Sequence, residues 1–235
     1  MNAGDSIDVL NSGWNFNGNT ARQFDKHIKR SVPLYEEGHH LIVQLSDFFL
    51  SNGAVCYDLG CATGTLLSKI AERNKHKKVE FIGVDVEEDM TNLAREKCGS
   101  NPGVNIITGN IVSMDFKKAD LIVCYYTIQF SLPKFRQSLI DRIYQALNWG
   151  GAFICFEKVR APDARFQDMM TSLYHDFKSE NGFTAEEIFS KAKSLKGILE
   201  PFSSQGNTDL LKRAGFTDIL SIMKYICFEG FLAIK

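Results

Sequence analysis

The sequence has no excess of charge of either sign and no long hydrophobic run. Lys and Arg total 27 against 28 for Asp and Glu, so no global field exists to hold nucleic acid or an anionic membrane. We therefore expect no direct nucleic-acid partner, although the balanced total does not exclude a local basic patch. The longest uncharged apolar stretch, residues 121–133, is too short to cross a bilayer, and residues 1–5 show no secretory signal.

The six cysteines include no C-x-x-C pair, which argues against a zinc site and a disulfide framework. Four of them lie in apolar, strand-like runs, as buried free thiols do in a reducing compartment. We expect no metal and a cytoplasmic location. Cys61 lies within a glycine turn, where we expect it to contribute its backbone.

No repeat or low-complexity tract interrupts the 235 residues, which suit one α/β domain spanning 1–235. Strand-like runs alternate with helical runs, and two further strand-like runs close the chain. The expected strands are 55–59, 79–85, 104–108, 120–126, 152–156, 219–223 and 226–234, and the expected helices between them include 65–71, 89–98 and 133–147. This order predicts a doubly wound, mostly parallel seven-stranded sheet with an antiparallel edge.

Four segments are expected around this pattern: a flap and helix (14–50), a cofactor-binding core (51–157), a helical lid after strand five (158–204), and a C-terminal helix with edge strands (205–235). Residues 1–13 are polar and expected to fray. Trp14 and Phe16 suggest a flap over a pocket, with a packed arm as an equal alternative. Apolar residues of the lid recur at helical spacing, which favours a cover for a substrate, with a packed helical pair as the alternative: Phe166, Met169, Met170, Leu173 and Phe177.

The stretch from Val55 to Gly64 organises the rest of the chain. Residues 55–59 favour a buried strand, two closely spaced glycines follow, and residues 65–71 favour a helix. Such a turn lets a ligand approach the backbone and the helix N-terminus. The G-x-A-x-G pattern behind Asp58 departs from the dinucleotide fingerprint, so a tight structural turn is an equal alternative for this stretch alone.

Asp85 favours a nucleoside site. It ends the second strand, 21 residues after Gly64, where an acidic residue can accept hydrogen bonds from a ribose diol; the alternative is a cap for the next helix. Asn110 and Ile111 end the third strand at the same edge, where they suit an adenine. The turn has no Lys or Arg, which favours a nucleoside with a zwitterionic tail, such as S-adenosylmethionine, over a pyrophosphate.

The chain resembles the class I S-adenosylmethionine-dependent methyltransferases, whose Rossmann-like fold it is expected to share, in its glycine turn, Asp85, residues 109–111 and the turn at 148–151. It is similar more specifically to the carboxy-S-adenosylmethionine synthases, a family that acts upstream of tRNA wobble-uridine modification. The segments that carry this likeness are residues 29–35, 57–61, 127–130 and 175–183, within a similarity that runs from about Trp14 to the C-terminus.

Pattern and resemblance together give a set of expected cofactor contacts: Tyr35, Asp58, Gly60, Cys61, Ala62, Gly64, Asp85, Val86, Asn110, Ile111 and Tyr125. Asn110 stands where the synthases have an acidic residue. The resemblance also implies two departures, since Tyr125 and Leu210 align with an Asn and an Arg that hold an additional carboxylate in the synthases. A leucine offers no donor to such a group.

We therefore expect a methyltransferase that uses ordinary S-adenosylmethionine on a small molecule, acting as a homodimer. His175 is the candidate base, with a structural role as the alternative, and Tyr126 and Tyr174 are expected in the pocket. Two alternatives stay open. The first is a carboxy-S-adenosylmethionine synthase, dependent on prephenate, with an altered carboxylate clamp. The second is a catalytically silent cofactor-binding or assembly protein, against which the glycine turn and Asp85 argue.

Overall fold

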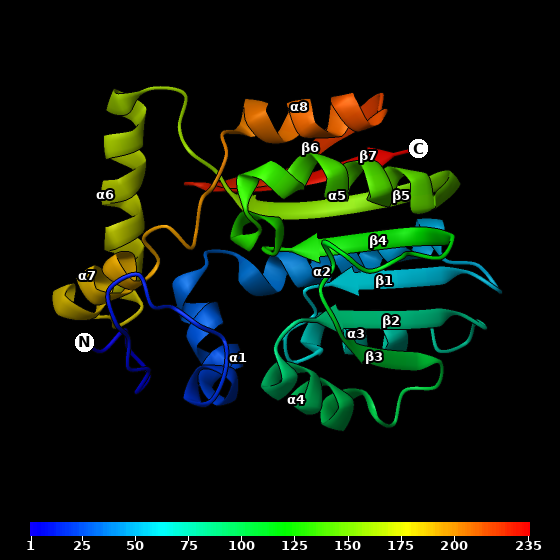
Figure 1. The fold of residues 1–235 in the computed structure, drawn as a ribbon, viewed down its shortest axis with the longest axis horizontal. Coiled ribbons are helices and arrows are strands. Elements are labelled where there is room, and N and C mark those ends of the chain that lie inside the picture. The colour runs from blue at the N-terminus through cyan, green and yellow to red at the C-terminus, as the bar shows by residue number, and fades with distance from the viewer.

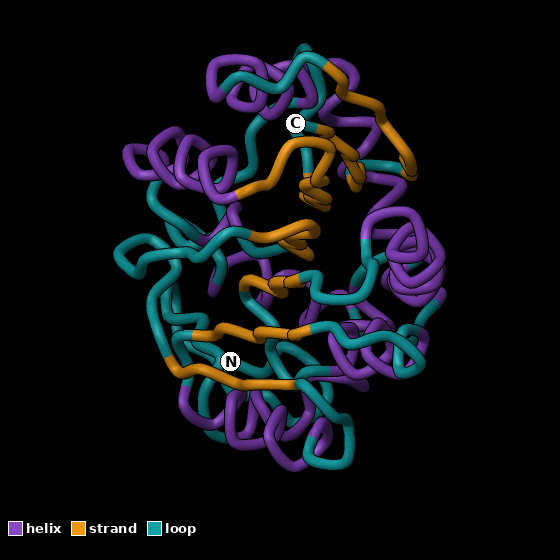
Figure 2. Tube along the Cα trace, turned by 90° about the vertical axis from the view of Figure 1, so that its right-hand side faces the viewer, coloured by secondary structure: helices purple, strands orange, loops and turns teal.

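The computed structural model describes residues 1–235 and contains one seven-stranded sheet with helices on both faces (Figures 1 and 2). The strand order is β3-β2-β1-β4-β5-β7-β6, in which β7 runs antiparallel to both of its neighbours and the other pairs are parallel. The strands are β1 (Val55–Leu59), β2 (Glu80–Asp85), β3 (Val104–Thr108), β4 (Ala119–Tyr125), β5 (Leu147–Lys158), β6 (Asp218–Tyr225) and β7 (Phe228–Ile234). The predicted doubly wound fold with an antiparallel edge is confirmed.

Eight α-helices and a short 3-10 helix surround the sheet. They are α1 (Asn19–Ser31), α2 (Tyr35–Phe49), α3 (Thr65–Arg73), α4 (Glu88–Cys98), η1 (Ile128–Phe130), α5 (Pro133–Ala146), α6 (Ala164–Glu180), α7 (Ala185–Ser194) and α8 (Ser204–Ala214). None of them is both long and apolar enough to cross a membrane. The sequence placed the helices of the sheet region to within about two residues, because their apolar spacing is regular.

Two hydrophobic cores lie on opposite faces of the sheet. Alternate residues of a strand point to opposite faces, so Ile122 of β4 belongs to the core under α5 and α8, whereas Val123 belongs to the core under α2 and α3. Both side chains are fully buried. The two-sided burial explains why the central strands read as continuous apolar runs.

The N-terminal segment is packed, so the expectation that residues 1–13 fray is wrong. Ala3 and Ile7 are each 1% exposed and form a small core with Val9 and Trp14. The amide of Trp14 donates to the carbonyl of Ser194 in α7 at 3.1 Å. The segment's polar composition hid this arrangement, because its few apolar side chains are buried only where they meet each other and residues Leu195 and Ile198, far away in sequence.

Helices α6 and α7 stand beyond the carboxyl ends of the strands, next to the N-terminal segment (Figure 1). Only part of the apolar pattern of α6 faces inward: Met170 packs against the core on the α2 face. Phe166, Met169 and Leu173 are each nearly half exposed. Helix α6 therefore packs against the rest of the chain with only part of the apolar face that its periodicity suggested.

Candidate cofactor and substrate site

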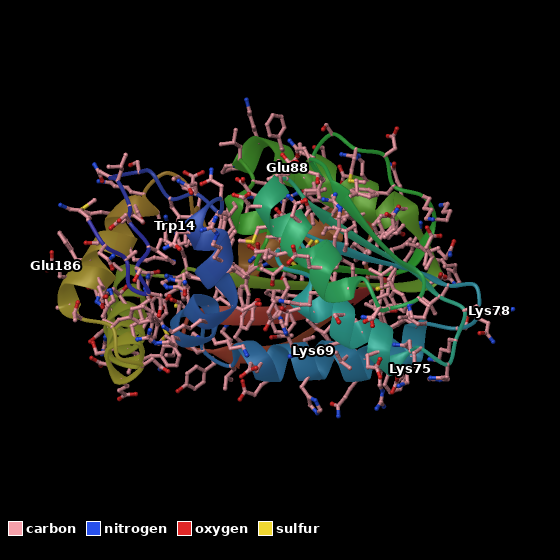
Figure 3. The ribbon with its side chains drawn as sticks, turned by 90° about the horizontal axis from the view of Figure 1, so that it is seen from below. Trp14, Lys69, Lys75, Lys78, Glu88 and Glu186 are labelled. Atoms are coloured by element: carbon pink, nitrogen blue, oxygen red, sulfur yellow. The ribbon has the colours of Figure 1, made fainter.

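A cavity of about 440 Å³ lies at the carboxyl ends of the parallel strands. Its floor comes from β1, β2, β4 and the loops that follow them. Trp14 and Phe16 of the N-terminal segment, α1, Tyr174 of α6 and Lys191 of α7 close the other side. In Figure 3, Trp14 lies beside α1 at the end of the molecule that carries α7, far from Lys75 and Lys78. Both interpretations of the aromatic segment therefore hold together: it is a packed arm, and it covers a pocket.

The glycine turn forms the first wall of the cavity. Gly60 has a φ of 81°, and a Cβ there would lie 2.3 Å from the Oγ1 of Thr127. The amides of Gly60 and Cys61 both donate to the carbonyl of Val84, which joins the turn to β2. Gly60 and Ala62 line the cavity, whereas Gly64 caps α3 and packs against α4 without reaching the cavity.

Asp85 couples this turn to the end of β2. One carboxylate oxygen accepts the amide of Ala62 at 2.9 Å, and the other accepts the amide of Glu87 at 3.0 Å. Each oxygen has a second lone pair, so the carboxylate can still receive the two hydroxyls of a ribose. Val86, which is 63% exposed, continues the same wall. The sequence predicted these positions, and the structure brings them together.

Asn110 and Ile111 extend the wall past β3. The Oδ1 of Asn110 accepts the amide of Val112 at 2.9 Å, which fixes the side chain and leaves its amide group free of protein partners. Ile111 is 8% exposed and lines the cavity beside it. A free amide donor next to an apolar surface matches the edge and face of an adenine ring.

A smaller cavity adjoins the glycine turn, and it contains buried polar atoms without partners. Asp58 and His39 line this cavity and are each only 1% exposed. Even so, neither carboxylate oxygen of Asp58 and neither ring nitrogen of His39 has a hydrogen-bond partner. Burial, reinforced by Asp85, raises the pKa of Asp58 to about 7, and burial lowers the pKa of His39 to about 3. Such orphaned groups cost free energy unless a ligand satisfies them. The ammonium and carboxylate of a methionine tail match an acid beside a neutral imidazole.

Aromatic side chains fill the region between the two cavities and α6. The rings of Tyr35 and Tyr125 lie 5.1 Å apart, and Tyr126 follows 4.7 Å from Tyr125. The Tyr125 hydroxyl donates to the carbonyl of Tyr35 at 2.7 Å, and the Tyr174 hydroxyl donates to the carbonyl of Ser31 at 2.8 Å. Tyr126 holds a φ of 61°, which turns the chain into the cavity after β4. These rings form a dry chamber that suits a sulfonium cation.

Leu210 does not belong to the site, so the interpretation that it replaces a carboxylate-binding donor is wrong. It lies on α8, 5% exposed in the core that this helix shares with α5. His175 is exposed on α6 and lines neither cavity. Sequence similarity around Leu210 does not show which face of the sheet its helix covers. The residue was therefore expected in the site although it lies in the core.

Two cavity lysines were missed in the sequence. The Nζ of Lys158, at the end of β5, lies 4.3 Å from the ring centroid of Tyr174, and no carboxylate pairs with it. Lys191 of α7 lines the cavity with its side chain otherwise buried. Lys191 stands in a charged helical stretch typical of a solvated surface, and Lys158 follows directly on the apolar run of β5, so only the fold reveals that both line the cavity.

The comparisons agree with this geometry. Residues 56–151 match the family model described as a methyltransferase domain. The carboxy-S-adenosyl-L-methionine synthase of Staphylococcus epidermidis is 36% identical over 226 residues, which cover 94% of this chain and 97% of that protein. The protein of the same name from Campylobacter lari is 37% identical over 227 residues, which cover 96% of this chain and 96% of that protein.

Solved structures show the same fold at lower identity. Human N-acetylserotonin methyltransferase in complex with S-adenosylmethionine superposes with a TM-score of 0.61 at 15% identity, covering 92% of this chain and 56% of that one. The named relatives match nearly the whole length of this chain, including its glycine turn and the acidic end of β2. This chain belongs to the carboxy-S-adenosyl-L-methionine synthase family, within the class I S-adenosylmethionine-dependent methyltransferases.

Proposed function

We propose that this chain transfers the methyl group of S-adenosylmethionine to a small molecule held in the aromatic part of the cavity. One observation carries the proposal: the nucleoside wall and the chamber of Tyr125, Tyr126 and Tyr174 line one continuous cavity. Trp14, Phe16 and α7 close it on the far side, which favours a small acceptor over a macromolecule. Six buried, unpaired cysteines support a reducing compartment for this activity.

The residues of the chain supply binding, orientation and exclusion of water. Asp85 would hold the ribose, Asn110 and Ile111 the adenine, and Asp58 with His39 the methionine tail. The bound cofactor supplies an electrophilic methyl group on a sulfonium. Closing the aromatic chamber keeps water from the cation and fixes the line of attack, which can account for several orders of magnitude in rate.

A second candidate function is the synthesis of carboxy-S-adenosylmethionine, which is what the named relatives are called. The specific observation in its favour is the presence of Lys158 and Lys191 in the cavity, where a cation could pair with a carboxylate. Tyr125 weighs against it, because its hydroxyl already donates to the backbone of Tyr35 and leaves no free donor at that position. Leu210 lies away from the cavity and so does not distinguish the two functions.

Mass spectrometry of reaction products separates the two functions. The purified protein is incubated with S-adenosylmethionine alone, with prephenate, and with an extract of small metabolites. We expect no carboxylated cofactor with prephenate, and a product heavier by one methylene unit in the extract, formed together with S-adenosylhomocysteine. Carboxy-S-adenosylmethionine at enzymatic rates would establish the second candidate in its place.

Replacing Asp85 with alanine should weaken cofactor binding by roughly 30- to 150-fold, the equivalent of about 2–3 kcal/mol for a lost charge-assisted pair. The change also removes the acceptor of the Ala62 amide, so the turn itself loosens. Calorimetric titration with S-adenosylhomocysteine measures the effect. Glu96→Ala, exposed on the outer side of α4, is the matched control. Unchanged affinity in the Asp85 variant would show that the ribose is held elsewhere.

We also propose that a second copy of the chain covers α6. Phe166, Met169 and Leu173 are 45–49% exposed and follow one another at helical spacing. A stripe of large apolar side chains on an outer helix is typical of a protein–protein contact. This helix stands at the left edge of the molecule in Figure 1.

Leu173→Glu should convert a dimer into a monomer of 26.5 kDa, because a carboxylate on this stripe would have to lose its hydration in the contact. Light scattering after size-exclusion chromatography reports the mass. Phe48→Glu, whose side chain is 80% exposed on α2, should leave the mass unchanged. A wild-type protein that is monomeric at high concentration would contradict the proposed dimer contact.

A further inference from the structure

Three hydrogen-bonded side chains connect the N-terminal segment to the cavity. An oxygen of Asp5 lies 3.1 Å from the Nδ1 of His27, and the Nε2 of His27 lies 2.7 Å from the Nζ of Lys191. Each residue comes from a different part of the chain: the N-terminal segment, α1 and α7. Lys191 lines the cavity, and its Nζ lies 3.2 Å from the ring centroid of Trp14. The series therefore ends at the cavity wall, on the side away from the nucleoside-binding turn.

The charge of Asp5 determines the direction of these hydrogen bonds. Its side chain is fully buried, and it receives Arg30 at 2.7 Å and Lys26 at 3.0 Å. Burial opposes ionisation, but the hydrogen bond from Lys26 and the charge of Arg30 outweigh it and lower the pKa of Asp5. An ionised Asp5 accepts the Nδ1 proton of His27, which leaves Nε2 as an acceptor facing Lys191.

Burial and two neighbouring lysines oppose the charge of Lys191, whereas Asp5 and the face of the Trp14 ring favour it. No carboxylate lies within ion-pair distance of its Nζ, and Lys178 of α6 and Lys158 of β5 face it from the neighbouring elements. Burial, followed by the charge of Lys178, lowers the pKa of Lys191 well below its ordinary value, whereas Asp5 raises it in part. Burial and Lys191 also lower the pKa of His27. Burial and the two lysines therefore favour the neutral amine, whose lone pair can accept a proton.

We propose that Lys191 is the general base of the reaction, with His27 and Asp5 as the positioning residues behind it. The proposal rests on the proposed methyl transfer, and it specifies an acceptor that must lose a proton, such as a hydroxyl compound. The acceptor oxygen gains the methyl carbon and gives its proton to Lys191 Nζ. The electron pair of the broken carbon–sulfur bond stays on sulfur.

This step conserves charge within the cavity. One positive charge disappears from the sulfonium and one appears on the Lys191 ammonium. The new ammonium donates to His27 Nε2, and the ionised Asp5 stabilises the pair from the far side of the ring. Proton transfer to a positioned base typically contributes 10²–10⁴-fold to a rate. Lys191 thus takes the role that the sequence suggested for His175.

The protonation state of Lys191 can be measured without any turnover. The protein is prepared with carbon-13 at the lysine side-chain methylenes and saturated with S-adenosylhomocysteine, and the Lys191 signal, assigned by its absence in Lys191→Met, is titrated between pH 6 and 11. We expect its midpoint well below the ordinary lysine value. A Lys191 midpoint above pH 10 would overturn the proposal, because an ammonium cannot accept the proton. This outcome is independent of whether methyl transfer is observed.

Two probe acceptors test the role in transfer, using the rate of S-adenosylhomocysteine formation at pH 8.5 in Lys191→Met, Lys193→Met and wild type. Phenol must be deprotonated, whereas 4-nitrophenol is already ionised at this pH. Lys191→Met should slow the reaction with phenol by at least 100-fold and that with 4-nitrophenol by less than tenfold, while Lys193→Met changes neither. If Lys191→Met slowed the reaction equally with both probes, Lys191 would have only a structural role. If wild type methylates neither probe, the titration alone decides about Lys191, and the metabolite products decide about the proposed function.

Discussion

Replacing Asp58 with asparagine should make the cofactor-free protein more stable and bind S-adenosylmethionine much more weakly. The folded-state pKa of Asp58 is about 7, against 3.8 for the ordinary group. Because the folded pKa is the higher of the two, the free energy of unfolding falls as the pH rises from about 4 to 7. At 1.36 kcal/mol per pKa unit the loss is roughly 4 kcal/mol. Asparagine cannot ionise and avoids this loss, although its amide is also buried without partners.

The expected net gain at pH 8 is about 2 kcal/mol, or roughly 5 °C in melting temperature for a chain of this size. The gain should shrink at pH 5, where the wild-type carboxyl is protonated. Cofactor affinity should fall by about 100-fold or more, because removing one partner of a buried ion pair costs about 3–5 kcal/mol. Wild-type affinity itself should rise with pH through the titration of Asp58.

Scanning calorimetry at pH 5 and pH 8, with and without S-adenosylhomocysteine, measures all of these effects. Asp120→Asn is the matched control. Its carboxylate accepts the amide of Val55 at 2.9 Å and the side-chain amide of Asn148 at 2.8 Å, so this variant should be destabilised. A lower melting temperature for the Asp58 variant at pH 8, or unchanged affinity, would contradict the assignment of Asp58 to the methionine tail.

Gly60→Ala should abolish detectable cofactor binding, because the new methyl group would enter the turn that faces the ligand. Its Cβ would lie 2.3 Å from the Oγ1 and 2.4 Å from the Cγ2 of Thr127, so the turn or the Thr127 segment must move. The φ of 81° adds strain of about 1–2 kcal/mol for any residue with a Cβ. Overpacking adds about 1–3 kcal/mol.

Gly53→Ala separates these two costs. Gly53 has a similar φ of 86°, but a Cβ there meets nothing within 4 Å. This variant should lose about 1–2 kcal/mol of stability and bind S-adenosylhomocysteine normally. Adding Thr127→Ala to Gly60→Ala should restore part of the stability, since it removes the two closest atoms. Denaturant unfolding and calorimetric titration measure both properties, and equal behaviour of the two glycine variants would show that steric contact with Thr127 is unimportant.

The nucleoside site and the proton-accepting site differ in how they are built. Residues 58–64, Asp85 and residues 110–111 follow directly from three strands, whose parallel pairing brings their carboxyl ends together. Asp5, His27 and Lys191 instead come from the N-terminal segment, α1 and α7, which are far apart in sequence. The first site is expected of any chain with this fold, whereas the second depends on how this chain packs its own additions.

The amino-acid sequence by itself determined the order of strands and helices, the antiparallel edge and the cofactor turn, because each rests on a local pattern. Alternating and helical spacings record which residues face a core, and the glycines record a backbone that must bend. Only the tertiary structure decided that residues 1–13 are packed, that Leu210 lies away from the cavity, and that Lys191 rather than His175 faces it. These are contacts between distant segments, and a charged residue on an amphipathic helix looks the same in sequence whether its side chain meets water or a cavity.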